Sequence, residues 1–299
     1  MKRIILTAAT LLALLSPSAS TLAQERIVIA PLFEYPTAPE EMASLEDRSN
    51  FLMENFWSPL DVKATTVSQH ALDDAFSVYV SAMQFADRDV VFKSIENLLK
   101  RLKKNPALLT QMTKAAEDNL YGSRADILSD EVYIPFLKAA VSNKKIPALR
   151  KARWKSQLAQ LERSSAGSTL PSFKIEERKE GNGFFIPRHK MTIIEFGDPS
   201  CEDCRFSRLT LETNVPLRTL VDSEKVGIAF IVVSPEEGWK DEVADYPSRW
   251  LVASSEGIDD LLDVRNSPTF YVLDSEGKIV AKNVSAERAA AIAIEGVKE

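Results

Sequence analysis

One stretch, residues 191–204, constrains what this chain can fold into more than any other. It contains both cysteines of the protein, Cys201 and Cys204, in a Cys-x-x-Cys arrangement. Residues 191–196 are β-prone and lead through Gly-Asp-Pro-Ser, a turn signal, into a segment of helical composition. A strand, a turn and then Cys-x-x-Cys at the start of a helix is the arrangement that dithiol–disulfide chemistry requires. The stretch therefore predicts a redox-active pair of thiols.

The position of each cysteine on the helix predicts its role. Cys201 would lie at the helix N-terminus, where unpaired N–H groups and the helix dipole stabilise a thiolate. Cys204 would lie one turn further along the same face, within reach to resolve a mixed disulfide. A structural zinc site is the weaker interpretation, because it needs about four ligands. The chain has only two Cys and two His, with His70 far away in the sequence and His189 isolated.

The first 23 residues have the pattern of a cleavable signal peptide. Lys2 and Arg3 are basic, residues 4–15 are apolar, and small residues follow up to Ala23. The apolar run is shorter than the roughly 20 residues that a bilayer span needs, and no later stretch is long and apolar enough to cross a membrane. We therefore expect a protein exported to the periplasm or cell envelope, without a membrane span.

Bulk composition limits the classes of partner and the meaning of the cysteines. A net charge of −6 gives no electrostatic reason to expect nucleic acid or an anionic membrane surface as a partner. In an oxidising compartment, structural disulfides usually join distant residues and close large loops. A disulfide across two intervening residues constrains little of the unfolded chain. Chemistry explains the pair better than stability does, so the expected cofactor is none beyond the Cys201–Cys204 disulfide itself.

The length of 299 residues predicts about two domains after the signal peptide. Residues 24–163 contain six stretches with apolar residues at helical spacing and short connections, which predict a small all-α domain. Its aromatic residues, Trp57 and Tyr133 among them, are expected in a core or a domain interface rather than in a ligand cage. Ser164-Ser-Ala-Gly-Ser168 has the composition of a linker.

Residues 164–299 predict an α/β domain in which a mixed sheet carries helices on both faces. The expected strands are residues 184–186, 191–196, 226–233, 270–273 and 278–281, with a hairpin at Asp274-Ser-Glu-Gly277. The expected helices are residues 205–220 and 285–297.

This second domain resembles the thioredoxin superfamily, and within it the TlpA-like envelope branch, over about residues 165–299. The strand–turn–Cys201-x-x-Cys204–helix unit carries the resemblance, together with Ser267-Pro268-Thr269 before a strand, which is similar to the family's cis-proline segment. Glu195 stands six residues before Cys201, where the family often places a buried carboxylate beneath the second cysteine. The chain departs from the family in having Ser200 where tryptophan is usual.

The resemblance implies a thiol–disulfide oxidoreductase of the bacterial envelope. Cys201 would be the attacking thiolate, Cys204 the buried resolving thiol, and Glu195 the group that takes the proton of Cys204. The substrate backbone would be held beside the sulfurs by three residues, Ser267, Pro268 and Thr269. The implied partners are protein or small-molecule thiols and disulfides, together with an envelope electron donor.

The first domain resembles a helical N-terminal domain of unknown function that occurs fused to thioredoxin-like domains in envelope proteins of Bacteroides-type bacteria. Phe33-Glu-Tyr-Pro36, Phe56-Trp57 and residues 131–137 carry this resemblance. It implies compartment and architecture rather than an activity.

The residues around Cys201 also suggest a redox direction. The like charges of Glu202-Asp203 are expected to raise the pKa of Cys201 against the helix dipole. A less stabilised thiolate lowers the reduction potential, which favours a reducing protein with a potential nearer ~−270 mV than ~−120 mV. Arg205 and Arg208 are expected on the solvated face of the helix.

Two other functions are open to a chain of this kind. It could be an envelope binding or adaptor protein whose helical domain recognises a partner and whose dithiol is secondary. The presence of Cys201, Cys204 and Pro268 together argues against that interpretation. A copper-handling protein would need a histidine near the Pro268 segment as a further ligand, and the sequence has none there.

Overall fold

The computed structural model describes residues 30–122, 125–179 and 181–298. All of these except Ala30 belong to one compact unit, Pro31–Glu299. The predicted signal peptide, residues 1–23, lies outside the described residues. The predicted boundary between residues 163 and 164 coincides with the end of a helix and otherwise stays a prediction.

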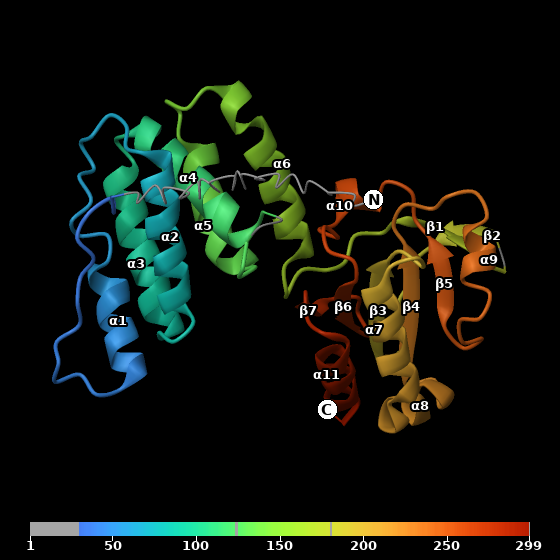
Figure 1. The fold of residues 1–299 in the computed structure, drawn as a ribbon. Helices are drawn as coiled ribbons and strands as arrows, with labels where there is room; N and C mark the ends of the chain where they lie inside the picture. The colour runs from blue at the N-terminus through green and yellow to red at the C-terminus, as the bar shows by residue number, and fades with distance from the viewer. Residues whose placement is uncertain (1–29, 123–124, 180, 299) are drawn as a thin grey trace, which may run out of the picture. The chain divides into compact units, whose positions relative to one another are not determined.

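The predicted all-α region forms six helices (Figure 1). They are α1 (Leu45–Asn55), α2 (Gln69–Met83), α3 (Arg88–Leu102), α4 (Pro106–Leu120), α5 (Asp130–Ser142) and α6 (Ala148–Ser164). Four of them begin where a polar side chain accepts a hydrogen bond from a backbone N–H of the first turn. These capping residues are Ser44, Ser68, Asn105 and Ser129. The local sequence thus determines where these helices start.

Aromatic side chains form the centre of the helical core. Phe56, Trp57, Phe76 and Tyr79 contact one another with ring centroids 4.9–6.0 Å apart. Trp57 and Tyr133 are both buried in this core, as the sequence predicted. Because such rings bury large apolar areas, they supply much of the stabilisation of a small helical region.

The rest of the chain forms a seven-stranded sheet with the strand order β2-β1-β5-β4-β3-β6-β7. The strands are β1 (Lys174–Glu177), β2 (Gly181–Phe184), β3 (Met191–Gly197), β4 (Val226–Val232), β5 (Leu251–Ser254), β6 (Thr269–Asp274) and β7 (Ile279–Lys282). The helices are α7 (Glu202–Thr213), α8 (Val215–Asp222), α9 (Trp239–Glu242), α10 (Ile258–Leu261) and α11 (Ala286–Lys298). β3 runs parallel to β4 and antiparallel to β6, so the sheet is mixed as predicted.

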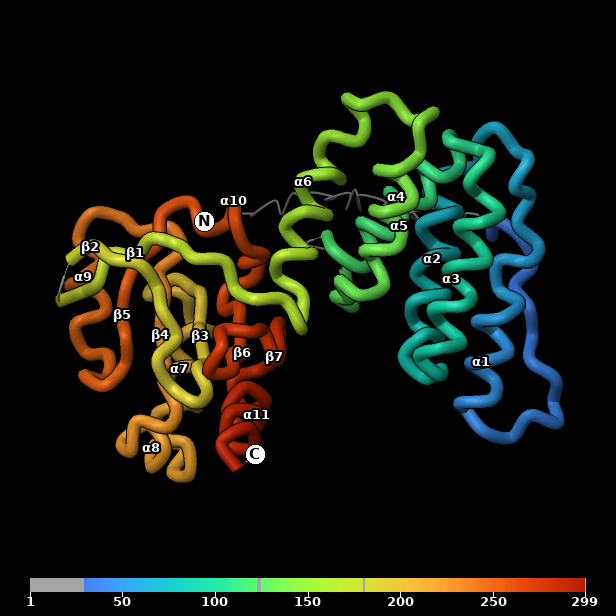
Figure 2. Tube along the Cα trace, turned by 180° about the vertical axis from the view of Figure 1, so that it is seen from behind, coloured from blue at the N-terminus to red at the C-terminus, as the bar shows by residue number. Residues whose placement is uncertain are grey.

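Strand β3 lies in the middle of this sheet and is buried along its whole length. Its side chains alternate between the two faces. One face of the sheet packs against α7, α8 and α11. The other face packs against α10 and the apolar residues that precede β1 (Figures 1 and 2). This confirms the predicted fold class, an α/β domain with helices on both faces of the sheet after a small all-α region.

Several predicted boundaries were wrong. The single helix expected over residues 205–220 is two helices, because Asn214 caps α8 and Pro216 lies in its first turn. The strand expected at residues 184–186 instead ends at Phe184. Strands β1 and β5 were not predicted, since each is only four residues long and lacks a clear alternation of apolar residues.

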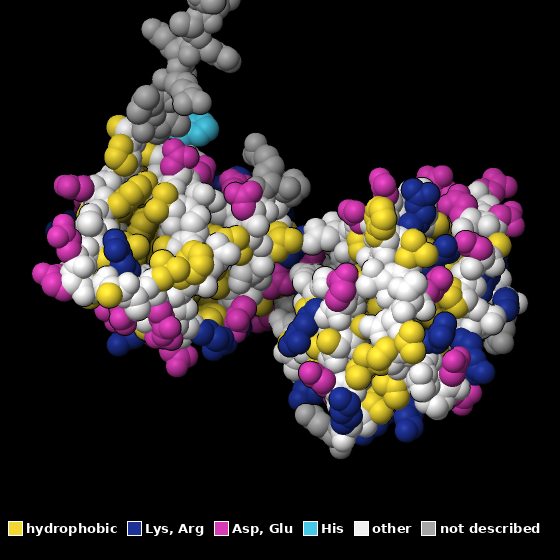
Figure 3. Space-filling view, turned by 60° about the horizontal axis from the view of Figure 1, so that its bottom comes forward, with side chains coloured by type: hydrophobic (Ala, Val, Ile, Leu, Met, Phe, Trp, Pro, Cys, Tyr) yellow, Lys and Arg dark blue, Asp and Glu magenta, His cyan; other side chains and the backbone are white. Residues whose placement is uncertain are grey.

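Acidic and basic side chains are interspersed on the face shown in Figure 3, with hydrophobic side chains in small groups between them. That face therefore carries no large field of a single sign. Within the part of the chain that the structure describes, no helix is both long and apolar enough to cross a bilayer.

Candidate active site

The two cysteines lie where β3 gives way to α7. Asp198 holds the intervening turn, since its Oδ1 accepts hydrogen bonds from the Ser200 N–H at 2.8 Å and the Ser200 hydroxyl at 2.7 Å. Cys201 is the N-cap of α7, and its sulfur accepts a hydrogen bond from the Cys204 N–H at 3.4 Å. The strand–turn–helix arrangement predicted for the Cys-x-x-Cys segment is therefore present.

The two thiols differ in exposure but share one neighbour, Ser267. Cys201 is partly exposed, whereas Cys204 is completely buried. The Cys201 thiol donates to the Ser267 carbonyl at 3.5 Å, and the Ser267 hydroxyl lies 3.2 Å from the Cys204 sulfur. The peptide bond between Ser267 and Pro268 is cis. The fold thus brings Ser267 against both sulfurs, although more than 60 residues separate it from them along the chain.

The pKa values of the two thiols move in opposite directions. Partial burial opposes ionisation of Cys201, but the Cys204 and Asp203 N–H groups, with hydrogen bonds from the neighbouring side chains, lower its pKa overall. Burial raises the pKa of Cys204 to about 12. The sequence-based expectation that the like charges of residues 202–203 raise the pKa of Cys201 was therefore wrong. Both side chains are exposed and screened by solvent, whereas the backbone N–H groups contact the sulfur directly.

Glu195 is a buried carboxylate on the face of the sheet that holds Cys204. It is 0% exposed, and its neighbours across β4 and β6 are Phe230 and Phe270. Neither of its carboxylate oxygens has a hydrogen-bond partner among the described residues. Burial raises the pKa of Glu195 to about 8, with a further increase from the charge of Cys201 and a decrease from Arg208.

Arg208 does not lie on a solvated helix face, so that expectation was wrong. Its side chain is 16% exposed and donates to both carboxylate oxygens of Asp245, at 2.9 and 3.0 Å. The guanidinium also lies 4.5 Å from the centre of the Tyr246 ring. The segment that contains residues 245–246 covers this side of α7, a long-range contact that helical periodicity cannot reveal. Arg205 is exposed, as expected.

Two further residues shape the site. A Cβ atom at Gly197 would lie 2.7 Å from the Cys204 sulfur, so only glycine leaves room for that thiol. The sequence analysis missed this role, although a glycine at the end of the strand before Cys-x-x-Cys is a usable signal. Thr269 is buried, and its hydroxyl donates to the Asn266 carbonyl at 2.6 Å. Its side chain therefore fixes the loop instead of facing solvent.

The described residues contain no group of three or more His, Cys, Asp or Glu side chains arranged to hold a metal ion.

Comparison with known protein families identifies the first half of the chain. Residues 14–164, just over half of the sequence, match the family model described as "Domain of unknown function (DUF5106)". The chain belongs to the DUF5106 family. The match covers all six helices of the helical region, so the predicted fusion of a helical domain of unknown function to a second domain is confirmed.

A solved structure shows the fold of most of the chain. A thioredoxin-like protein from Bacteroides caccae is similar with a TM-score of 0.75 and 18% sequence identity, covering 89% of this chain and 99% of that one. This similarity confirms a thioredoxin-like fold after the DUF5106 domain.

Two further similarities each cover less than half of the chain. The thioredoxin domain of a thiol-disulfide oxidoreductase from Bacteroides vulgatus covers 44% of this chain and 98% of its own, at 21% identity and a TM-score of 0.39. A thiol:disulfide interchange protein from Bacteroides sp. covers 46% of this chain and 92% of its own, at 20% identity and a TM-score of 0.39. The search of curated proteins found no match.

Proposed function

We propose that this chain is a thiol–disulfide oxidoreductase that exchanges disulfides through Cys201 and Cys204. The observation that carries the proposal is the contrast between the two thiols. Cys201 is accessible and has a lowered pKa, whereas Cys204 is buried and has a pKa raised to about 12. Because the thiolate is the nucleophile, this contrast favours attack by Cys201 on the substrate disulfide. Cys204 is then the thiol that resolves the mixed disulfide formed on Cys201.

The exchange has two balanced steps. The Cys201 thiolate attacks one sulfur of a substrate disulfide, which forms a mixed disulfide and releases the other substrate sulfur as a thiolate that takes up a proton. Cys204 then loses its proton and attacks the Cys201 sulfur. The Cys201–Cys204 disulfide forms, and the second substrate sulfur leaves as a thiol. Two electrons have passed from the dithiol to the substrate.

Glu195 is the proposed acceptor of the Cys204 proton. A carboxyl group with a pKa of about 8 exchanges protons readily near neutral pH. Its two carboxylate oxygens have no hydrogen-bond partner among the described residues, so they are free to take up a proton. We propose that the Ser267 hydroxyl, which contacts the Cys204 sulfur, keeps that thiol oriented toward Cys201.

The substrate side of the site is proposed to be the surface beside Cys201. Phe206 and Leu209, on the exposed side of α7, are 60% and 48% exposed and offer apolar contact to a polypeptide. Ser267 contacts both sulfurs, and the backbone of the Pro268 that follows it is the proposed contact for the substrate main chain. The substrates would be protein or small-molecule thiols and disulfides.

The compartment is a proposal that rests on the sequence. The signal-peptide pattern of residues 1–23 supports export to the periplasm or cell envelope. An exported protein that acts as a reductant would need an envelope electron donor to regenerate its dithiol.

Insulin reduction and mixed-disulfide trapping test the proposed activity. Cys201→Ser should abolish the reduction of insulin disulfides, whereas Cys204→Ser should accumulate a mixed disulfide on Cys201 because the resolving thiol is missing. Iodoacetamide at neutral pH should modify Cys201 faster than Cys204 in the reduced protein. Faster modification of Cys204 would reverse the assignment of the two roles, and insulin reduction by Cys201→Ser would refute the proposal.

The redox direction can be tested separately. A lowered pKa of Cys201 stabilises the thiolate and thus the reduced protein, which raises the potential relative to the sequence-based expectation. We expect a potential between ~−270 mV and ~−180 mV, still on the reducing side. Equilibration in glutathione buffers followed by thiol counting measures it. A value above about −180 mV would contradict a reducing role.

A further inference from the structure

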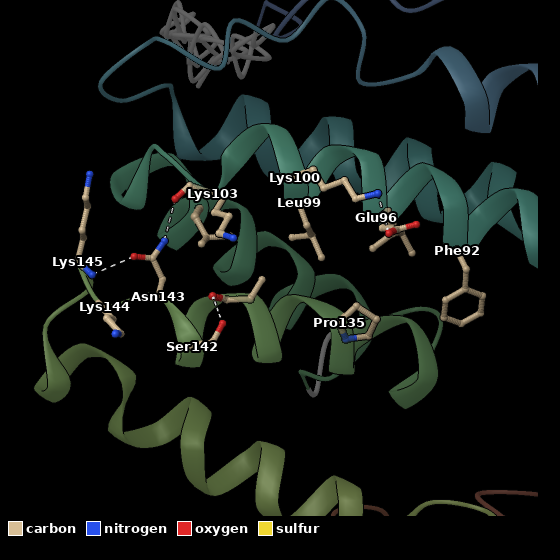
Figure 4. A pocket seen from close by; sticks show the side chains of 13 residues that line it. Phe92, Glu96, Leu99, Lys100, Lys103, Pro135, Ser142, Asn143, Lys144 and Lys145 are labelled. Atoms are coloured by element: carbon tan, nitrogen blue, oxygen red, sulfur yellow. Dashed lines mark hydrogen bonds and ion pairs between the residues drawn. The ribbon is translucent and has the colours of Figure 1, made fainter.

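The DUF5106 domain contains a cavity that the proposed redox chemistry does not use. It lies between α3 and α5, next to Leu109 of α4, and has a volume of about 810 Å³ (Figure 4). Cavities that bind small molecules commonly have volumes of about 300–1,000 Å³. The cavity is partly open to solvent, so a ligand can reach it from outside. Its volume is therefore suited to a small molecule.

The floor of the cavity is apolar. Ile95 and Leu99 contribute from α3, Leu109 from α4, and Pro135 and Ala139 from α5. Pro135 lies inside α5, and its apolar ring lines the cavity. An occupant in contact with this floor must itself be apolar.

The other end of the cavity is basic. Lys103 follows the last turn of α3, and Lys144 and Lys145 follow the last turn of α5. Asn143 joins these two places, since its side chain donates to the Lys103 carbonyl at 3.1 Å and accepts from the Lys145 N–H at 3.0 Å. The three lysines therefore gather at one end of the cavity, as Figure 4 shows.

The positive charge at that end is not neutralised within the described structure. No carboxylate of the described residues lies within 4.0 Å of the ammonium groups of Lys103, Lys144 or Lys145. Glu96 is the carboxylate among the cavity residues, and it pairs with Lys100 at 2.7 Å. Lysines after a helix also stabilise its C-terminus, but that effect does not require an open apolar cavity beside them.

We propose that this cavity binds a single-chain amphiphile with an anionic head group. The alkyl chain would lie on the floor formed by α3 and α5, and a carboxylate or phosphate head would meet Lys103, Lys144 and Lys145. A folded protein partner fits less well, because a stable protein interface buries about 800 Å² on each side. The volume of the cavity, its apolar floor and the charge at one end match a small elongated ligand.

Calorimetric titration of the full chain with simple amphiphiles tests this proposal. Decanoate and decyl phosphate, below their micellar concentrations, should each bind at one saturable site, and the stronger of the two identifies the preferred head group. 1-Decanol has the chain without the charge and should bind at least about tenfold more weakly. Acetate has the charge without the chain and should give no binding signal.

Paired variants assign the binding to this cavity. Lys103→Glu with Lys145→Glu should weaken binding by about tenfold or more. The matched control is Lys93→Glu with Lys104→Glu, which reverses two exposed lysines of the same region that do not line the cavity and should leave the affinity unchanged. Ala139→Phe, which fills the floor, should abolish binding while the thermal unfolding temperature shows that the chain is still folded.

Three results would overturn the proposal. They are no saturable binding of either anionic amphiphile, equal binding of 1-decanol, and equal weakening by the control pair. Binding of an unfolded polypeptide but not of the amphiphiles would instead identify a peptide groove, which also contradicts it. Insulin reduction is measured on the same samples, so that loss of the redox activity and loss of amphiphile binding are distinguished.

Discussion

At the scale of single residues, the feature that most needs a functional reason is Glu195. Its carboxylate is buried and has no hydrogen-bond partner in the part of the chain that the structure describes. Such a group destabilises the folded protein, because ionisation in an apolar environment is costly. The protein reduces that cost by keeping Glu195 protonated, and the raised pKa of Glu195 reflects this. Such groups concentrate at sites where a proton must be moved.

We expect Glu195→Gln to keep the fold and to slow the resolving step by about 100-fold near neutral pH. The amide fills the same volume but cannot accept the Cys204 proton. Stopped-flow reduction of a model disulfide measures the effect. In the unchanged protein, the rate should rise with pH until Glu195 is ionised, near pH 8. The same pH profile in both proteins would show that Glu195 has only a structural role.

The same carboxyl group should make stability depend on pH. The folded pKa of Glu195, about 8, lies above the ordinary pKa of about 4.3. The folded state therefore keeps a proton that the unfolded chain has released. The free energy of unfolding should fall as pH rises through this window, by up to about 1.4 kcal/mol per pH unit, and level off above the folded pKa. Urea unfolding at several pH values should show this slope, and a parallel slope in Glu195→Gln would assign it to other groups.

At the scale of secondary-structure elements, helix α7 and helix α8 are separated by a single residue, Asn214. Its side chain accepts a hydrogen bond from the Leu217 N–H at 3.0 Å and so caps α8, while Pro216 occupies the first turn. α8 packs Leu217 and Val221 against the same face of the sheet as Cys204.

Asn214→Ala should lower the free energy of unfolding by about 1 kcal/mol, because a backbone N–H at the start of α8 loses its partner. Asn214→Asp is the matched control, since aspartate caps a helix about as well. Urea unfolding compares the two variants. Equal loss of stability in both would mean that the side chain has another role than capping.

At the scale of the whole molecule, a cluster of largely buried charges joins residues from distant parts of the chain. Asp130, the first residue of α5, pairs with Lys282 and Arg265, each at 2.6 Å. Lys282 also pairs at 2.5 Å with Asp263, which is 1% exposed. Arg265 stands two residues before Ser267 and thus belongs to the loop that contacts both sulfurs. The DUF5106 domain is in this way connected to the loop of the candidate active site.

Burial alone would raise the pKa of Asp130, but Lys282 and Arg265 outweigh it and lower that pKa. The carboxylate therefore contributes stability above its unfolded pKa of about 3.9, and this contribution is lost as pH falls through the folded pKa. Asp130→Asn should destabilise the chain by about 2 kcal/mol in urea unfolding at neutral pH, since Lys282 and Arg265 each lose one of their two carboxylate partners and keep Asp263. Glu162→Gln is the control, because it removes an exposed pair with Lys138 and should cost less than about 1 kcal/mol. Equal effects would contradict a special role of the cluster.

The sequence by itself determined the local features of this protein. Helical spacing and capping residues such as Ser44 and Asn105 determined the six helices, and the apolar runs predicted β3, β4 and β6 to within one or two residues. The strand–turn–Cys-x-x-Cys unit also follows from neighbouring residues. These features depend on hydrogen bonds and side-chain periodicity within a few residues, so the information lies in the adjacent sequence.

Only the tertiary structure decided which distant groups meet. It placed Asp245 on Arg208, surrounded Glu195 with aromatic rings, and turned the pKa of Cys201 downward through backbone N–H groups. The apolar cavity with lysines at one end likewise depends on how α3 and α5 pack. Burial and long-range contacts depend on the path of the whole chain, and these set the electrostatics of a site. Local patterns therefore identify the chemistry of the two thiols, while the packed fold sets their pKa values and the shape of the cavity.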